Sequence, residues 1–239
     1  MIKTIAFDAD DTLWVNETIF TSTREKIERL LVDYVTEQSL EERLNETEIK
    51  NLNLFGYGIK GFILSTIETC IEITNSAVTG ETIQQVIDLG KEMLQHPVEI
   101  LPYVRSTIDI LKDQYQLMII TKGDLFDQES KIARSGLADY FDIIEVVSEK
   151  EPKVYSGLFQ KYNVIPQELL MVGNSLKSDI LPLCQIGANA VHIPFHTTWS
   201  HEIISHEATN GYHYGVLESM QELPAYIEAL QTSKGSARV

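Results

Sequence analysis

The stretch M-I-K-T-I-A-F-D-A-D-D-T-L-W-V, residues 1–15, passes from apolar residues directly into a group of carboxylates. Its apolar part is rich in β-forming residues and is bounded by polar ones, which is typical of a buried parallel strand. Asp8, Asp10 and Asp11 follow where that strand ends. Buried carboxylates are costly unless a cation or hydrogen-bond donors compensate them. We therefore predict a metal or proton-transfer site here, at the edge where open α/β sheets hold their ligands.

Asp8 and Asp10 are two residues apart, a spacing that directs both side chains to the same side of a strand. One carboxylate is then able to attack a substrate while the other handles a proton. Taken alone, the stretch also allows a simpler interpretation, an acidic turn that closes an edge strand.

The composition limits the class of protein. The 239 residues suffice for one large domain or two modest ones, and the apolar fraction of 44% supports a hydrophobic core. With 35 acidic and 19 basic residues, the formal charge of −16 argues against nucleic acid or an anionic membrane as a partner. An anionic small molecule stays open as a substrate, because it needs only local positive charge. Cys70 and Cys184 lie far apart in apolar periodic stretches, so we expect both to be reduced.

The sequence shows neither a signal peptide nor a run of ~18 apolar residues, so we expect a cytoplasmic protein without a membrane-spanning segment. The expected assembly is a monomer or a homodimer. The last residues, Ser233–Val239, are small and polar, and we expect them to be disordered.

Residues 16–96 differ from the rest of the chain in the spacing of their apolar residues. Apolar residues recur at helical spacing in about four segments between Thr21 and His96, and no strand-like stretch interrupts them. We expect an all-helical insertion whose main break is Phe55-Gly56-Tyr57-Gly58. Glycines there permit a tight bend or a close approach to a ligand, although a plain turn between two helices accounts for them equally well.

After Pro102 the chain alternates between helical and strand patterns. Helices are predicted over 104–115, 125–135, 154–162 and 176–186, and short apolar strands over 116–120, 143–147, 169–172 and 190–193. Such alternation implies right-handed crossovers and a parallel sheet. We therefore expect residues 1–15 and 97–239 to form one α/β core.

Three of the predicted strands end in residues suited to phosphoryl transfer. Asp8–Thr12 follows the first strand, Thr121-Lys122-Gly123 the second, and Gly173–Asp179 the fourth. The carboxyl ends of parallel strands lie on one edge of a sheet, and Lys150 and Lys153 add ammonium groups there. Together, the residues at these three strand ends and the two lysines provide a nucleophile, ligands for a metal ion and donors for phosphoryl oxygens.

The chain resembles the haloacid dehalogenase (HAD)-like hydrolase superfamily, specifically its phosphatase branch with a helical (C1-type) cap. An acidic first motif, a helical insertion, a Ser/Thr motif, a lysine and a Gly-Asp-type motif follow one another in that family's order, over nearly the whole chain. The resemblance implies a Rossmann-like core of three layers and a mobile cap. It also implies Mg²⁺-dependent hydrolysis of a small phosphorylated metabolite through an aspartyl-phosphate. Dehalogenases lack the second acid of the first motif, so Asp10 favours a phosphatase.

The resemblance assigns roles to individual residues. Asp8 is the expected nucleophile, and Asp10 is the expected acid that protonates the leaving alcohol and the base that then activates water. Thr121 is expected to donate its hydroxyl to the phosphoryl group, with the backbone amide of Lys122 as a further donor. The expected Mg²⁺ ligands are Asp8, the backbone carbonyl of Asp10, Asn174 and Asp179.

A lysine is expected to hold both the phosphate and Asp8, a task suited to the point charge of an ammonium group. Two candidates lie in Glu149-Lys150-Glu151-Pro152-Lys153, which departs from the family's usual lysine before Pro-x-Pro. We choose Lys150, because it precedes the proline in the loop. Lys153 is expected to begin a helix and to face solvent.

Two residues depart from the family pattern. Asp11 stands where glycine is common, but aspartate is among the few residues that tolerate a left-handed backbone. Asn174 stands where the family usually has aspartate. This change removes one negative charge from the metal site, and we expect it to weaken magnesium binding.

Five of the six histidines fall in one stretch: His192, His196, His201, His206 and His213. A zinc site is one interpretation of such a cluster. No cysteine accompanies these residues, however, and His196 and His201 lack the i, i+4 spacing of helical metal motifs. Surface histidines on a long loop are the favoured interpretation.

The sequence leaves two alternative functions open. A phosphosugar mutase of the same fold would require a bisphosphate intermediate for turnover. A non-catalytic binding protein that retains the fold is suggested by Asn174 and by the net charge.

Overall fold

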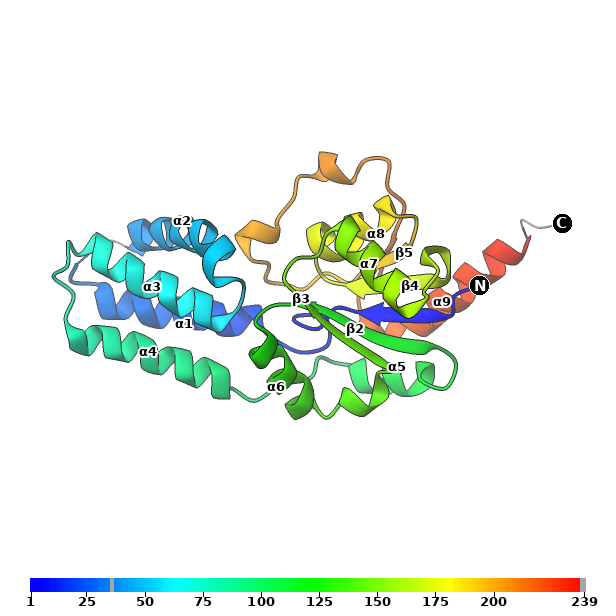
Figure 1. The fold of residues 1–239 in the computed structure, drawn as a ribbon, viewed down its shortest axis with the longest axis horizontal. Coiled ribbons are helices and arrows are strands. Elements are labelled where there is room, and N and C mark those ends of the chain that lie inside the picture. The colour runs from blue at the N-terminus through cyan, green and yellow to red at the C-terminus, as the bar shows by residue number, and fades with distance from the viewer. Residues whose placement is uncertain (35–36, 237–239) are drawn as a thin grey trace. The chain divides into compact units, whose positions relative to one another are not determined.

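The computed structural model describes residues 1–34 and 37–236, and these form two compact units (Figure 1). The core unit contains Met1–Val15, Val98–Lys122 and Lys131–Val239, and the helical unit contains Asn16–Pro97 and Gly123–Ser130. No helix among the described residues is both long enough and apolar enough to cross a membrane.

Within the described residues, the core unit is built on a six-stranded parallel sheet. Its strands are β1 (Thr4–Phe7), β2 (Gln116–Lys122), β3 (Ile143–Val147), β4 (Leu169–Gly173), β5 (Asn189–His192) and β6 (Gly215–Val216). They lie in the order β3-β2-β1-β4-β5-β6, and each neighbouring pair is parallel. The chain fills one side of β1 with β2 and β3 and then crosses to the other side for β4 and β5. The carboxyl end of β1 is therefore the switch point at which sheets of this kind bind ligands.

Helices cover both faces of this sheet. They are α5 (Val104–Leu111), α6 (Leu125–Ser135) and α9 (Leu223–Ser236) on one face, and α7 (Pro152–Tyr162) and α8 (Leu181–Gln185) on the other. Buried side chains alternate between the faces, so that Ile5 and Phe7 of β1 join one hydrophobic cluster and Ala6 joins the other. Burial on both faces explains why β1 has three apolar residues in succession, Ile5, Ala6 and Phe7, rather than alternating polar and apolar ones. The predicted Rossmann-like α/β core of three layers is confirmed.

Some elements of the core unit differ from the prediction. The helix predicted over 176–186 is a π-helical turn, Leu176–Ile180, followed by the short α8. Neither β6 nor α9 is predicted, and α9 continues to Ser236, so the expectation of disorder is wrong for residues 233–236. Residues 237–239 of the same expected tail lie outside the described residues. Short 3₁₀ turns occur at Ala138–Tyr140, Pro166–Glu168, Ser200–Glu202, His206–Thr209 and Met220–Glu222.

The helical unit is built from α1 (Glu17–Leu31), α2 (Glu37–Phe55), α3 (Ile59–Ile73) and α4 (Gly80–Gln95). These helices lie where the apolar periodicity predicts them. The break between α2 and α3 falls at the predicted glycines, since Gly56 and Gly58 have positive φ angles of 70° and 102°. Ile27, Leu44 and Phe62 belong to a hydrophobic cluster of this unit that is separate from the two clusters of the core unit.

The helical unit also takes in residues 123–130, which the sequence-based boundaries place in the core. The Lys60 ammonium lies 2.8 Å from Asp124 Oδ1 and 5.4 Å from the centre of the Phe126 ring. Contacts between residues so far apart in the chain leave no periodic signal in the sequence, which is why pattern analysis misses this grouping.

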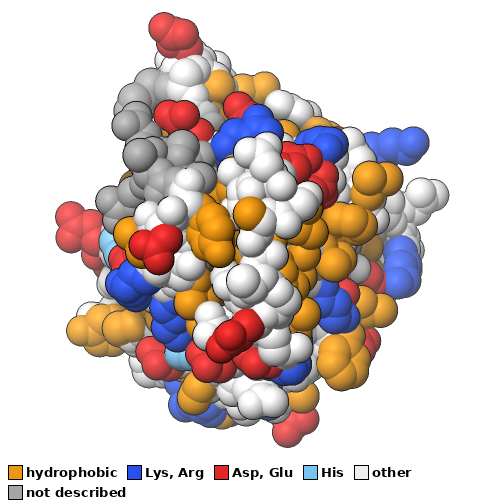
Figure 2. Space-filling model, turned by 90° about the vertical axis from the view of Figure 1, so that its left-hand side faces the viewer, with side chains coloured by type: hydrophobic (Ala, Val, Ile, Leu, Met, Phe, Trp, Pro, Cys, Tyr) orange, Lys and Arg blue, Asp and Glu red, His pale blue; other side chains and the backbone are white. Residues whose placement is uncertain are grey.

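Charged side chains on the helical unit form exposed ion pairs, including Lys26–Glu92, Arg43–Glu46 and Lys50–Glu68. On the face drawn in Figure 2, acidic and basic side chains are interspersed among hydrophobic ones. The net charge of −16 is therefore not gathered into a single acidic field on that face. Exposed pairs of this kind each stabilise a protein by about 0–1 kcal/mol.

The packing of α4 on α3 predicts opposite effects for two glycine substitutions in α4. A Cβ at the buried Gly90 would lie 2.6 Å from Ile63 Cγ1, whereas a Cβ at Gly80 meets nothing within 4 Å. Overpacking costs about 1–3 kcal/mol, which outweighs the gain of about 0.5–1 kcal/mol from replacing glycine in a helix. We expect Gly90→Ala to lower the urea midpoint of unfolding and Gly80→Ala to leave it unchanged or raise it. Equal midpoints for the two variants would contradict this packing.

Candidate active site

A tight turn begins directly after β1. The Asp8 N–H donates to the carbonyl oxygen of Val172 in β4 (2.9 Å), and the Asp11 N–H donates to the carbonyl oxygen of Trp14 (2.7 Å). Asp11 has a φ angle of 60°, so the prediction that this aspartate adopts a left-handed backbone is confirmed. The turn keeps Asp8 and Asp10 at the carboxyl end of the central strand.

Lys150 lies between two buried carboxylates. Its Nζ is 2.5 Å from Asp8 Oδ1 and 2.7 Å from Asp179 Oδ1, and the side chains are only 2%, 9% and 1% exposed. Lys153 is exposed, in the first turn of α7. The structure thus brings Lys150, and not Lys153, to the side of Asp8.

Charge in this buried group shifts the pKa values of its members. Burial and the neighbouring Asp179 carboxylate raise the pKa of Asp8 to about 7, against the lowering effect of Lys150. Burial alone would lower the pKa of Lys150, but Asp179 and Asp8 outweigh it and raise that pKa well above its ordinary value. The ammonium of Lys150 therefore stays charged, whereas burial and the Asp179 carboxylate favour the protonated form of Asp8.

Thr12 links Asp8 to Asn174. The Thr12 hydroxyl lies 3.1 Å from Asp8 Oδ2 and 3.2 Å from Asn174 Oδ1, and both of these oxygens are acceptors for its single proton. His192 Nε2 lies 2.9 Å from the carbonyl oxygen of Asn174, which fixes the backbone of this residue from β5. Asn174 therefore lies beside Asp8, as its position at the end of β4 predicts.

Asp179 is positioned by the π-helical turn and by Gly173. The Ser175 N–H donates to Asp179 Oδ2 at 3.0 Å. A Cβ at Gly173 would lie 2.4 Å from Asp179 Cγ, so only glycine allows this carboxylate to approach the strand end so closely.

Asp10 has a separate set of partners. Lys131 Nζ lies 2.8 Å from each of its two carboxylate oxygens, and the indole N–H of Trp14 donates to Asp10 Oδ1 at 2.8 Å. The sequence analysis does not single out Lys131, because nothing in the pattern of α6 distinguishes it from a solvent-exposed lysine.

Thr121 ends the buried part of β2, two residues after Ile119, which is paired with Phe7 of β1. Its side chain is buried, with the residue 1% exposed, and its hydroxyl has no hydrogen-bond partner among the residues that the structure describes. Buried hydroxyls without a partner are rare in folded proteins, so this one indicates a donor kept for a ligand.

Glu202 is a second residue that the sequence analysis misses. It lies on the long segment between β5 and β6 and accepts from Lys122 Nζ (2.7 Å), Ser175 Oγ (2.6 Å) and Ser178 Oγ (2.6 Å). Burial acts to raise the pKa of Glu202, but Lys122 and the two hydroxyls outweigh it and lower the pKa to about 2. The ammonium of Lys122 is thereby engaged by a carboxylate of the protein, which leaves its backbone amide as the predicted donor to a substrate.

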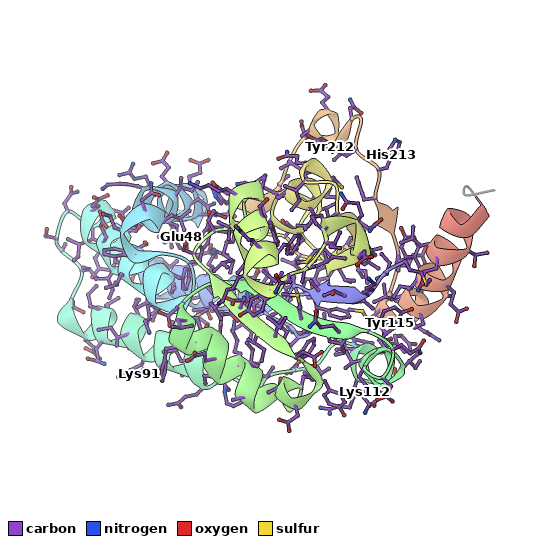
Figure 3. The ribbon with its side chains drawn as sticks, turned by 45° about the vertical axis from the view of Figure 1, so that its right-hand side comes forward. Glu48, Lys91, Lys112, Tyr115, Tyr212 and His213 are labelled. Carbon is purple, nitrogen blue, oxygen red and sulfur yellow. The ribbon has the colours of Figure 1, made fainter. Side chains whose placement is uncertain are left out.

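The clustered histidines whose side chains the structure describes form no group able to hold a metal ion. His196 and His213 are exposed, and Tyr212 and His213 lie on the segment that precedes β6 (Figure 3). His201 contacts Lys177, with 3.2 Å between Nε2 and Nζ. The side chain of His206 lies outside the described residues. In the described part of the chain, no three or more His, Cys, Asp or Glu side chains form a group able to hold a metal ion.

The chain belongs to the haloacid dehalogenase-like hydrolase family, whose family model matches residues 2–187. A haloacid dehalogenase-like family hydrolase from Xanthomonas campestris has a similar crystal structure, with a TM-score of 0.88 and 35% identity over 99% of this chain and 95% of that one. The predicted family, fold class and hydrolase class are confirmed.

Several curated relatives of this chain are named as phosphatases. A glyceraldehyde 3-phosphate phosphatase from Methanothermobacter thermautotrophicus is 24% identical over 93% of this chain and 98% of its own length. The N-acylneuraminate-9-phosphatase of Homo sapiens is 26% identical over 57% of this chain. The chain spans about half the length of some curated relatives that it matches, 56% and 55% in two cases. These similarities support a hydrolase that acts on phosphomonoesters.

The low pKa of Glu202 predicts an acid-dependent loss of stability. Because its folded pKa of about 2 lies below the ordinary value of 4.5, the stabilisation is present above pH ~4.5 and is lost as the pH falls toward 2. This shift corresponds to roughly 3 kcal/mol at neutral pH. We expect Glu202→Gln to be destabilised at pH 7 in urea unfolding and to approach the wild type at pH 3. The matched control is Glu92→Gln, which removes an exposed ion pair with Lys26 and should change stability little at either pH. A constant difference between Glu202→Gln and wild type across this range would contradict the assignment.

Proposed function

We propose that this protein is a Mg²⁺-dependent phosphatase that hydrolyses a small phosphomonoester through an aspartyl-phosphate on Asp8. The observation that carries the proposal is the contact of Asp8 with Lys150 Nζ on one oxygen and with the Thr12 hydroxyl on the other. This arrangement positions a buried carboxylate at the carboxyl end of the central strand. The phosphatase names of its relatives support the same reaction class.

Asp8 and Asp10 divide the reaction into two steps. In the first step a carboxylate oxygen of Asp8 attacks phosphorus, the bond from phosphorus to the leaving oxygen breaks, and Asp10 gives that oxygen a proton. In the second step Asp10 takes a proton from water as the water oxygen attacks the same phosphorus. The bond to Asp8 then breaks, which restores its carboxylate and releases inorganic phosphate. Acid–base assistance of this kind contributes about 10²–10⁴ in rate.

Lys150 and Thr121 supply positive charge and a hydrogen bond to the phosphoryl group. Lys150 touches the nucleophile and is buried, so its charge acts on the reacting group with little screening by solvent. The buried hydroxyl of Thr121, which has no partner in the described part of the chain, provides a donor for a phosphoryl oxygen. Donors that are already in place need no reorganisation when charge develops.

The donors around Asp8 fit a magnesium ion. Asp8, Asn174, Asp179 and the Asp10 carbonyl offer hard oxygen atoms, and magnesium characteristically takes one or two carboxylates and keeps several waters. Burial, and after it the neighbouring Asp179 carboxylate, raise the pKa of Asp8 despite its contact with Lys150. Bound there, the ion would neutralise phosphoryl charge and favour the ionised form of Asp8.

We propose that the helical unit selects the substrate. It joins the core unit directly after the turn that carries Asp8 and Asp10, and it has its own hydrophobic cluster. The relatives are named for glyceraldehyde 3-phosphate and for N-acylneuraminate 9-phosphate, so small phosphorylated metabolites are the class to test.

The direct test is phosphate release from a panel of phosphomonoesters, including sugar phosphates, nucleotides and an aryl phosphate. We expect Asp8→Asn to abolish turnover while the protein remains folded, because the substitution removes the nucleophile and keeps its volume. Circular dichroism serves as the folding control, and mass spectrometry excludes deamidation back to aspartate. Turnover above a few per cent of wild type in verified Asp8→Asn protein would remove Asp8 from this role.

Asn174 allows a test of the magnesium proposal. An amide oxygen ligates without formal charge, so Asn174→Asp should tighten Mg²⁺ binding and Asn174→Ala should weaken it. One carboxylate near a divalent ion contributes about a few kcal/mol at an effective dielectric of ~20. Calorimetric titration of the three proteins with Mg²⁺ measures the effect independently of activity. One shared dissociation constant would show that Asn174 is not a ligand.

A further inference from the structure

The carboxylate of Asp10 is surrounded by hydrogen-bond donors. Lys131 Nζ lies 2.8 Å from both Oδ1 and Oδ2, and Trp14 Nε1 donates to Oδ1 at 2.8 Å. The side chain of Asp10 is 21% exposed and that of Lys131 is 12% exposed, so solvent screens this ion pair only partly. A cation in contact with both oxygens fixes the plane of the carboxylate as well as its position.

These contacts come from two rigid supports. Trp14 is fully buried in the cluster of the core unit that contains Ile5 and Phe7, at the end of the turn that carries Asp10. Lys131 lies on α6, next to Ile132, which is buried in the same cluster. Neither side chain has a part in the two reaction steps described above. Their shared contact with Asp10 therefore calls for a separate role.

We propose that Lys131 is a positioning residue that holds the Asp10 carboxylate in place as the base for hydrolysis of the aspartyl-phosphate. The inference rests on the proposed function and concerns its second step. The ammonium of Lys131 on both oxygens and the indole N–H of Trp14 on one oxygen hold the carboxylate in a single orientation. Lys131 acts through Asp10 and touches neither the substrate nor phosphorus.

The two steps respond differently to the loss of such a residue. With 4-nitrophenyl phosphate the leaving group departs without help from an acid, so transfer of the phosphoryl group to Asp8 depends little on Asp10. The return of the phosphoryl group to water still requires the base. Loss of Lys131 should therefore slow the second step, so that the phosphoenzyme accumulates.

The experiment is pre-steady-state kinetics of Lys131→Met with 4-nitrophenyl phosphate. We expect kcat and KM to fall together by roughly 10- to 100-fold, with kcat/KM nearly unchanged, because positioning accounts for part of the rate that acid–base assistance provides. A burst of 4-nitrophenol should approach one equivalent per enzyme. Mass spectrometry of acid-quenched samples should show the added phosphoryl group on Asp8.

Matched variants separate this role from a structural one. Lys131→Arg should restore kcat, because guanidinium also contacts both carboxylate oxygens. Lys112→Met removes an exposed lysine, labelled in Figure 3, whose Nζ lies 2.9 Å from Asp109, and it should leave both constants unchanged. Lys131→Gln is the second variant if Lys131→Met fails to fold.

The outcomes distinguish the inference from the proposed function. A wild type that releases no 4-nitrophenol contradicts the proposed function itself. An active wild type with unchanged kcat in folded Lys131→Met or Lys131→Gln contradicts the role of Lys131 alone. A parallel fall in kcat and kcat/KM without a burst shows a structural role and likewise overturns the inference.

Discussion

The contact of Lys150 with two buried carboxylates is the interaction on which the site depends. Taking three charges out of water is expensive, and such a group persists only when its geometry satisfies every member. Asp8 comes from the end of β1, Asp179 from the turn after β4, and Lys150 from the loop before α7. Removing one partner leaves an uncompensated buried charge, so these three loops are constrained together by electrostatics and not only by the sheet.

Backbone features around this group follow from that constraint. Gly173 has no side chain because the Asp179 carboxylate occupies the space where a Cβ would lie. The π-helical turn brings Asp179 back toward the strand while the Ser175 N–H binds its second oxygen. On the other side, the left-handed Asp11 closes the turn that returns the chain toward Trp14. Glu202 then ties a distant segment to the same edge through Lys122 and two serines.

Much of the fold and part of the site are predictable from the sequence, because buried strands and the residues at their ends leave a recognisable pattern. Burial on both sheet faces makes the strands apolar, and the residues at their carboxyl ends share one edge, so Asp8, Asn174 and Asp179 are found by position. The proline after Lys150 distinguishes it from Lys153. Lys131 and Glu202 are different, since Lys131 lies 121 residues from Asp10 in the chain and no periodicity encodes that contact. The two-residue β6 is too short to give a pattern, and α9 contains Pro224 and Gly235, which usually mark breaks.

The burial of Trp14 against Asp10 has an optical consequence. The chain contains two tryptophans, and the other, Trp199, lies on the segment between β5 and β6. Indole emission depends on the charges and hydrogen bonds around the ring, and the Trp14 N–H is bonded directly to the side chain assigned to proton transfer. The protein therefore carries a native fluorophore bonded to the carboxylate that we propose as the acid and base, so that rearrangement of this carboxylate should change the emission of Trp14 without a label.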